Sequence, residues 1–441
     1  SVILTGSTDT AKLFLRMRLG IDLHAETGGK NAIIVTSMAD RDLAVKDIIQ
    51  SAFAHSGQKC SAASLLICEK EIYEDQNFLR QLRDAANSLS VGSAWEDHTM
   101  VAPLINEPQG NLKRALHELE EGESWLLEPK ADSKNPQLWS PGIKLAVKPG
   151  NFTHKNELFG PVLSIICAKD LEDAIHIAND TCYGLTSGIH SLDEDEHKIW
   201  LENIQAGNLY INRGITGAVV RRQPFGGIKE SSFGNGYKAG GSNYLIQMMQ
   251  CSQIALPKEK ALLDTVVSNY IQRVHSSLSI EEHELLQASA ASYAFYWRYF
   301  RIDHDPSRLQ GQDNILCYRP HQNITFRVQK ENTLVNISRV LLACITCNVA
   351  ITLSISQNTL NKIENILPEE NSLISLFVED DFSLMKRISL GEIKRLRLLS
   401  PPTEGFLYAA AEGLCTISAE AVIANGRIEL LHYLKEFSIS S

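Results

Sequence analysis

The stretch from Glu26 to Ala62, ETGGKNAIIVTSMADRDLAVKDIIQSAFAHSGQKCSA, indicates both the fold class and a candidate site. Its Ala32–Thr36 run is apolar and rich in β-branched residues, which predicts a core strand. Ser37 followed by Asp40 fits a helix-capping pattern, so a helix is expected to follow. The apolar positions of that helix recur with the spacing of a stripe packed on a sheet: Val45, Ile48, Ile49, Ala52 and Phe53.

Two reactive groups lie in the turns of this strand–helix–strand unit. Glu26 precedes a pair of glycines, and Cys60 follows 34 residues later in the Gly-Gln-Lys-Cys-Ser turn before the strand Ser64–Cys68. A thiolate nucleophile and a carboxylate base, each set among flexible residues, suit an enzyme that forms a thioester. The alternatives are a small buried cysteine and a solvated surface carboxylate. We assign the buried role to four other cysteines: Cys68, Cys167, Cys182 and Cys251.

The pair and its spacing resemble the catalytic pair of the NAD(P)-dependent aldehyde dehydrogenases. That resemblance implies that Cys60 attacks the aldehyde and that Glu26 activates the water that hydrolyses the thioester. The chain opens with an apolar run, Val2–Thr5, which predicts a buried strand, followed by a Gly6-Ser7 turn and a helical pattern. By the resemblance, Gly6 and Ser7 lie where the family meets the NAD pyrophosphate. The segment Asn156-Glu157-Leu158-Phe159-Gly160-Pro161 resembles the family's Glu-x-Phe-Gly-Pro motif. By this resemblance Glu157 holds the nicotinamide ribose and Phe159 packs beside the nicotinamide ring.

A later segment points to one branch of the family. Residues 213–227 and the run Lys238-Ala239-Gly240-Gly241 resemble the glutamate γ-semialdehyde (1-pyrroline-5-carboxylate) dehydrogenases, in particular the module found in bacterial proline utilization A. The N–H groups of two glycines can approach a carboxylate closely. The resemblance therefore implies that Gly240 and Gly241 anchor the substrate's α-carboxylate, with the Ser61 hydroxyl beside the nucleophile and Phe233 along the aliphatic part.

The expected fold is α/β: an aldehyde dehydrogenase fold followed by a degenerate Rossmann-like α/β domain without a cofactor. We predict four parts: the end of an NAD-binding domain (1–26), a catalytic domain (27–228), a substrate-anchor and return segment (229–256), and a non-catalytic C-terminal domain (257–441). In the last part, residues 258–275 and 280–299 look helical, and three later runs look like strands: Ile315–Tyr318, Ile324–Val328 and Val349–Ile355. Long forms of proline utilization A carry a similar tail, whose implied role is to cover a substrate tunnel. Cys344 and Cys347 form a C-x-x-C in an apolar run, for which buried packing is favoured over metal binding.

Bulk composition restricts the function classes. A formal net charge of −10 over 441 residues argues against a nucleic-acid partner, because phosphate binding needs a basic surface. Nine cysteines without framework spacing suit the reducing cytoplasm. The long uncharged run Val340–Asn361 is interrupted by polar residues, so no transmembrane segment is expected, and no metal site is expected either. Because the first residues form an apolar run without an initiator Met, we expect a fragment of a longer chain.

The expected activity is NAD-dependent oxidation of glutamate γ-semialdehyde to glutamate, the second step of proline breakdown. The resemblance also implies a proline dehydrogenase with FAD earlier on the same polypeptide, and leaves open both a homo-oligomer and the choice between NAD and NADP. Two alternatives remain. One is a dehydrogenase for another aldehyde, and the other is a scaffold or tunnel lid with a vestigial site.

Overall fold

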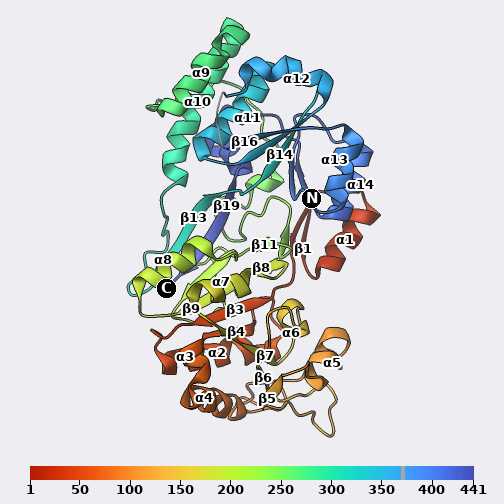
Figure 1. The fold of residues 1–441 in the computed structure, drawn as a ribbon, viewed down its shortest axis with the longest axis vertical. Helices are drawn as coiled ribbons and strands as arrows, with labels where there is room; N and C mark the ends of the chain where they lie inside the picture. Colours follow the sequence, from red (N-terminus) through yellow and green to blue (C-terminus); the bar gives the residue numbers. More distant parts are fainter. Residues whose placement is uncertain (369–372) are drawn as a thin grey trace.

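A nine-stranded sheet joins the first half of the chain to its last residues (Figure 1). The computed structural model describes residues 1–368 and 373–441. All neighbouring strands are parallel except the pairs at the two edges, β13/β19 and β5/β6. The strands follow in the order β13 Asn314–Pro320, β19 Leu434–Ser440, β10 Asn208–Ile211, β9 Thr186–His190, β3 Asn31–Val35, β4 Ala63–Glu69, β7 Val162–Ala168, β6 Gly142–Leu145 and β5 Ser124–Leu127.

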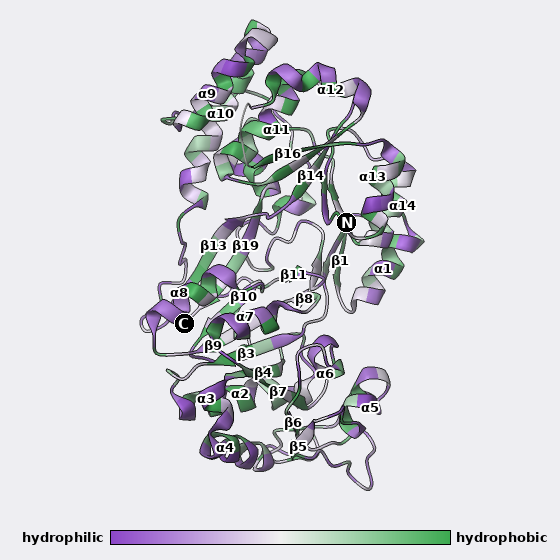
Figure 2. Ribbon diagram, viewed as in Figure 1, coloured by the Kyte–Doolittle hydropathy of each residue, from purple (hydrophilic) through white to green (hydrophobic). Residues whose placement is uncertain are grey.

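Strand β3 is covered on both faces, as its continuous apolar run predicts. Ile33 and Val35 point into a cluster with α2 (Arg41–Phe53) and α4 (Gln76–Asn87). Ala32 and Ile34 point to the other face, where α7 (Leu171–Asn179) and α8 (Glu194–Asn203) pack. Figure 2 shows these strands apolar along their length, whereas the covering helices are polar on their outer sides. The predicted strand–helix–strand unit is confirmed.

The start of α2 differs from the prediction. Asp40, not Ser37, caps the helix: its carboxylate accepts the N–H groups of Asp42 and Leu43, each over 3.1 Å. Ser37 lies in the preceding turn, where its N–H donates to Glu69 Oε2 over 2.8 Å. An acid at the N-cap satisfies two free backbone donors directly, so the helix begins later than the capping pattern indicated.

A second, three-stranded sheet consists of β1 (Val2–Thr5), β2 (Leu23–Glu26) and β12 (Ser232–Phe233), with α1 (Thr8–Met17) packed on it. The strand Val2–Thr5 was expected to be buried, and this is wrong. It lies at a sheet edge, pairs only with β2, and leaves Ile3 57 % exposed.

The tail forms its own parallel sheet in the order β16 (Ile374–Val378), β15 (Ile351–Ile355), β14 (Ile324–Val328), β17 (Arg395–Arg397), β18 (Thr416–Ser418). The first strand lies in the middle and the order reverses there, as in half of a Rossmann fold. One side is packed by α9 (Thr265–Val274), α10 (Ile280–Phe300) and α11 (Leu334–Cys347), and the other by α13 (Asp381–Ser389) and α14 (Glu404–Gly413). The predicted helices and strands of the tail are therefore present. The absence of a cofactor there stays a prediction.

The tail also contributes to the first sheet, because β13 and β19 extend it beyond β10. The sheet thus crosses the predicted boundary at residue 257, and the domain division remains a prediction. The other elements are short: η1 Ala54–Gly57, α3 Lys70–Glu74, α5 Gly110–His117, α6 Phe152–Lys155, β8 Tyr183–Gly184, β11 Ile228–Lys229, η2 Ile246–Met248, η3 His275–Ser277, α12 Gln357–Ile363, η4 Glu364–Ile366, α15 Gly426–Glu429 and η5 Leu430–His432.

The cysteine predictions are partly wrong. Cys68, Cys344 and Cys347 are buried as expected, whereas Cys167, Cys182 and Cys251 are exposed. Cys167 shares a face of β7 with the buried residues Leu163 and Ile165, and it is exposed at the last position of the strand on that face. The other two lie in segments between strands and helices.

Candidate active site

The amino ends of four parallel strands bring the predicted site residues together. Strands β9, β3, β4 and β7 are consecutive neighbours in the sheet and run in one direction. Their preceding turns therefore share one edge: Gly28-Gly29 before β3, Cys60 before β4 and Glu157 before β7. Parallel pairing thus explains how residues more than a hundred positions apart meet.

Asn31, the first residue of β3, holds the Cys60 turn. Its Nδ2 donates to the carbonyls of Cys60, over 2.8 Å, and Ala62, over 2.9 Å. Its Oδ1 accepts the N–H of Thr186 at the start of β9, over 3.0 Å. Thr186 in turn donates from its hydroxyl to the Ser61 carbonyl, over 3.3 Å. One buried amide therefore ties three strands to the turn that carries the thiol.

Replacing Asn31 with alanine is expected to destabilise the protein by about 2–4 kcal/mol, because three buried backbone groups lose their partner. Urea denaturation of the intact protein measures this loss. The matched control is Asn87→Ala, which removes the same side chain from an exposed position at the end of α4. Equal losses in the two variants would contradict the role given to Asn31.

The two glycines allow the turns to touch. A Cβ at Gly29 would lie 2.6 Å from the Cys60 carbonyl oxygen, and one at Gly28 would lie 2.2 Å from Glu157 Oε2. The Gly29 N–H donates to Glu157 Oε1 over 2.8 Å. Burial raises the pKa of Glu157, and this hydrogen bond and the charge of buried Lys30 act against the rise. Only residues without side chains let Glu157 and the Cys60 turn approach this closely.

Glu26 ends β2 with its carboxylate in a polar recess. Its Oε2 accepts the Gly227 N–H over 2.8 Å. Burial raises the pKa of Glu26 to about 7, although the Gly227 N–H and the charge of Lys238 both lower it. A carboxylate that titrates near neutral pH can both take and release a proton, as a general base must.

The Cys60 thiol is half-buried, and its pKa is raised. Burial is the largest cause, followed by the negative charge of Glu26, while the N–H groups of Ser61 and Cys60 itself act against the rise. The thiol is therefore protonated at neutral pH and needs a base to become a nucleophile. The influence of Glu26 on this pKa places the carboxylate near the sulfur.

Lys238 belongs to the site, and sequence reasoning gave it no role. Its side chain is fully buried, with Nζ donating to the Gly226 carbonyl and, over 3.4 Å, to Asn208 Oδ1. Burial lowers the pKa of Lys238 to about 8, against the charges of Glu26 and Glu436. Its own N–H donates to Glu436 Oε2 over 2.6 Å, so the tail strand β19 touches the loop beside Glu26. The sequence shows only a lysine before Ala-Gly-Gly, and this pattern does not indicate that the Lys238 side chain is buried.

The residues expected at a cofactor adjoin this cluster. The Gly6 N–H donates to the Glu26 carbonyl over 3.1 Å, and Ser7 caps α1 by accepting the Thr10 N–H over 3.2 Å. Phe159 has a left-handed backbone, at φ +53°, and its side chain is 42 % exposed. Among the described residues Glu157 Oε2 accepts no hydrogen bond, so a free acceptor and an exposed ring lie together. This free acceptor and exposed ring fit a ribose hydroxyl and a flat heterocycle.

The residues expected to bind the substrate differ in whether their hydrogen-bond donors are free. Gly240 has φ +78° and open space around it, but the Gly241 N–H already donates to the Lys238 carbonyl over 2.9 Å. Ser61 is buried, and among the described residues its hydroxyl has no hydrogen-bond partner. Phe233 pairs with Ala25 across from β2 and packs with the apolar cluster under α1.

Residues 1–368 and 373–441 contain no cluster of three His, Cys, Asp or Glu side chains able to hold a metal ion. In the same residues, no helix has the length and apolar character needed to span a membrane.

Comparison with known proteins supplies the family. The model of the aldehyde dehydrogenase family matches residues 1–254. A 1-pyrroline-5-carboxylate dehydrogenase of Geobacillus sp. is 37 % identical over 232 residues, which are 52 % of this chain and 44 % of that protein. The structure of proline utilization A from Corynebacterium freiburgense matches 99 % of this chain and 41 % of its own, with TM-score 0.83 and 38 % identity. A 1-pyrroline-5-carboxylate dehydrogenase from Thermus, solved with bound NAD, matches 56 % of this chain and 48 % of its own, with TM-score 0.50 and 36 % identity.

The chain thus spans less than half the length of these relatives. The predicted α/β aldehyde dehydrogenase fold is confirmed, and the solved relative extends over the tail as well.

Proposed function

Because this chain belongs to the aldehyde dehydrogenase family, we propose that it carries the nucleophile and base for NAD-dependent oxidation of glutamate γ-semialdehyde to glutamate. The observation that carries the proposal is the position of the Cys60 turn, which Asn31 holds against the Gly28-Gly29 turn that follows Glu26. The negative charge of Glu26, whose own pKa is about 7, contributes there to the raised pKa of the thiol. A thiol that is protonated at rest and a base poised near neutral pH are complementary.

The proposed reaction begins at the aldehyde carbon. Glu26 takes the thiol proton, and Cys60 Sγ attacks the carbonyl to form a thiohemiacetal whose oxyanion the Cys60 N–H can stabilise. Bound NAD supplies the acceptor for the hydride that leaves this carbon, and a thioester remains on Cys60. Glu26 releases the thiol proton to solvent before the second half of the reaction. It then takes a proton from water, the resulting hydroxide attacks the thioester, and the C–S bond breaks to give glutamate and the Cys60 thiolate, which takes up a proton to restore the thiol.

Four residues are proposed to hold the cofactor, with the fit described above: Gly6, Ser7, Glu157 and Phe159. Gly6 and Ser7 form the turn at the start of α1, where backbone N–H groups and the helix dipole suit a phosphate. Glu157 offers its free oxygen to a ribose hydroxyl. This arrangement does not separate NAD from NADP.

The proposed substrate rests on Gly240, Gly241 and Ser61, and on the similarity to proteins named 1-pyrroline-5-carboxylate dehydrogenase. Among these groups, the Gly240 N–H and the Ser61 hydroxyl have no hydrogen-bond partner within the described residues. They are the donors that the structure makes available for a carboxylate. Phe233 packs with the apolar cluster under α1, and its predicted place along the aliphatic part of the substrate stays a prediction.

Replacing Gly240 with alanine is expected to raise KM for glutamate semialdehyde by about tenfold or more, because φ +78° strains a residue with a side chain and moves the donor. NADH formation by the intact protein measures KM, beside propionaldehyde, which has no α-carboxylate. The control is Gly150→Ala, also at positive φ in open space, but in a remote loop. Equal losses with both aldehydes would contradict a carboxylate anchor at Gly240.

We further propose that a flavin-dependent proline dehydrogenase lies on the same polypeptide and supplies the semialdehyde, with FAD as its cofactor. The similarity to proline utilization A over nearly the whole chain supports this. The proposed compartment is the cytoplasm, which suits nine cysteines that are all free. Steady NADH formation from proline in the intact protein would test the arrangement. If the intact protein made no NADH from semialdehyde and did not bind NAD, the vestigial scaffold would replace the enzyme.

A further inference from the structure

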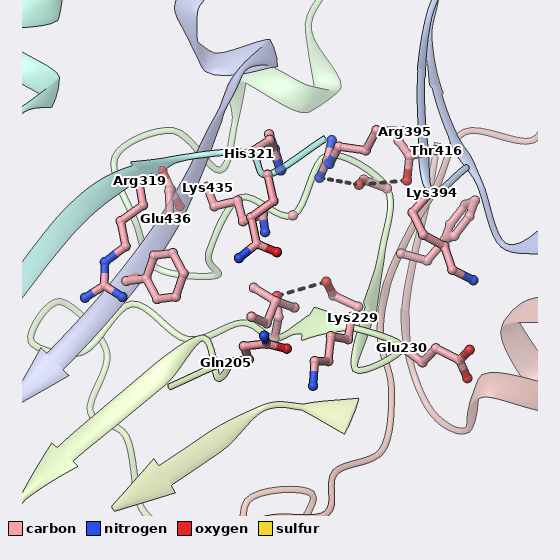
Figure 3. A pocket seen from close by; sticks show the side chains of 18 of the residues that line it. Gln205, Lys229, Glu230, Arg319, His321, Lys394, Arg395, Thr416, Lys435 and Glu436 are labelled. Atoms are coloured by element: carbon pink, nitrogen blue, oxygen red, sulfur yellow. Dashed lines mark hydrogen bonds between the residues drawn. The ribbon is translucent and has the colours of Figure 1, made fainter. Parts of the chain in front are cut away.

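A cavity of about 520 Å³ lies between the amino edges of the two main sheets. Lys435 and Glu436 enter it from the start of β19, and His321 enters from the end of antiparallel β13. Arg395 and Thr416 enter from the first residues of β17 and β18 in the tail sheet. Figure 3 shows these side chains directed into one space. The cavity is distinct from the thiol site, since Cys60, Glu26 and Glu157 do not line it.

The lining is cationic although the chain as a whole is acidic. Of the three carboxylates in the lining, Glu436 is already bound to the Lys238 N–H and to Asn243. Glu230 lies on the wall opposite Arg395 (Figure 3), and Glu202 is exposed on α8. Against them stand five cationic side chains: Lys229, Arg319, Lys394, Arg395 and Lys435.

Two of the lining nitrogens have no partner. His321 is 4 % exposed, and its Nε2 makes no hydrogen bond. Among residues 1–368 and 373–441, no hydrogen bond or ion pair reaches the half-buried Lys435 ammonium. Beside them, half-buried Arg395 donates to the carbonyls of Gly234 and Asn235, which are neutral and leave its charge uncompensated. Polar groups buried without partners are rare in folded proteins and call for an explanation.

The pKa shifts of Lys435 and His321 also indicate that positive charge in the cavity is not balanced. Burial first, then the charges of Arg395 and Lys229, lowers the pKa of Lys435 to about 8. Burial, followed by the charges of Arg395 and Lys435, holds the pKa of His321 well below its usual value. Like charges therefore repel each other here with no carboxylate to relieve them, and an anion would relieve them.

Two other lysines that line the cavity do have hydrogen-bond partners for their ammonium groups. Lys394 donates to the Gly413 carbonyl at the end of α14 over 3.1 Å. Lys229 donates to the carbonyls of Asn179, over 2.7 Å, and Thr181, over 3.1 Å. Their ammonium groups satisfy backbone acceptors, whereas that of Lys435 faces the cavity free.

We propose that this cavity is a binding site for a small anion that carries a carboxylate or phosphate group, held by Lys435 with His321 and Arg395 beside it. The volume is that of an ordinary ligand pocket. Apolar groups complete the lining, among them Pro320, Ile228 and Phe437, whose ring carries the Arg319 guanidinium 4.4 Å above its centre. An organic anion with a short apolar body therefore fits as well as an inorganic one. The proposal does not depend on the reaction at Cys60.

The test is calorimetric titration of the intact protein with inorganic phosphate and, separately, with malonate, at constant ionic strength set by NaCl. Saturable binding is expected, and Lys435→Met is expected to weaken it about tenfold or more, since a charge-assisted contact is lost. Lys435→Arg should retain binding. The control Lys394→Met, which removes another lysine of the same cavity from the tail-sheet side, should change affinity less than about twofold. If only one of the two anions binds, the result identifies whether the site takes a phosphate or a carboxylate group.

Thermal unfolding without added anion separates binding from folding. Lys435→Met removes an uncompensated charge, so its melting temperature should equal or exceed that of the parent protein. A lower melting temperature would mean that Lys435 has a structural partner, and it would overturn the assignment. The absence of saturable binding of both anions, or equal weakening by the two methionine variants, would overturn it as well.

Discussion

Cys60→Ala is expected to abolish aldehyde oxidation, with kcat falling by about 10⁴-fold or more, because no other group can form the covalent intermediate. The half-buried thiol lies in a turn held by Asn31, next to a base whose charge raises its pKa. Loss of one sulfur atom from a turn should leave the fold intact. The measurement is NADH formation from glutamate semialdehyde by the intact protein, with circular dichroism to establish that the variant is folded.

The matched control for this variant is Cys167→Ala. That cysteine is exposed on β7, at the opposite end of the strand from Glu157, and should tolerate the change without loss of turnover. Turnover that survives in Cys60→Ala, or that falls equally in Cys167→Ala, would remove Cys60 as the nucleophile.

Glu26→Gln is expected to lower turnover by about 10²–10⁴-fold, the usual contribution of a positioned base. Burial raises the pKa of Glu26 to about 7, so the carboxylate is protonated and inactive below that pH and becomes an active base above it. The rate should therefore rise with pH through about 7 in the parent protein. In the glutamine variant this rise should disappear, because the amide does not titrate. Rates measured from pH 5.5 to 8.5, a span of about 1.5 pH units on either side of that pKa, check both points.

The control for the base is Glu230→Gln, a carboxylate near the same Gly227 loop. Among residues 1–368 and 373–441, its side chain makes no hydrogen bond or ion pair with the thiol turn. It should preserve the pH profile. If the rise near pH 7 persisted in Glu26→Gln, another group would have to be the base, and Lys238 would be examined first because its pKa is about 8.

Much of the central unit could be predicted because its signals are local. The apolar run at Ala32–Thr36 and the helical spacing after Asp40 fix which residues face the sheet, and they leave Cys60 in the next turn. Glu157 and Phe159 were recognisable from a short motif, and their convergence on the Gly28-Gly29 turn follows from parallel strand pairing.

Features that depend on distant pairing could not be predicted. No local pattern indicates that Leu434–Ser440 pairs with a strand more than two hundred residues earlier, or that Glu436 reaches the Lys238 loop. The exposure of Cys167 depends on its place at the end of β7, and that of Val2–Thr5 depends on β1 lying at a sheet edge. Burial of a lysine is likewise invisible in composition, since lysine is usually exposed. Lys238 therefore had no predicted role until its neighbours were known.

The most direct measurement is mass spectrometry of the acyl-enzyme. Mixing the parent protein with glutamate semialdehyde and NAD, and quenching with acid within the first turnover, should trap the acyl group before water releases it. The account predicts a γ-glutamyl adduct on the peptide that contains Cys60, formed together with one equivalent of NADH. NADH formation with the acyl group on another residue, or with no adduct at any quench time, would contradict it.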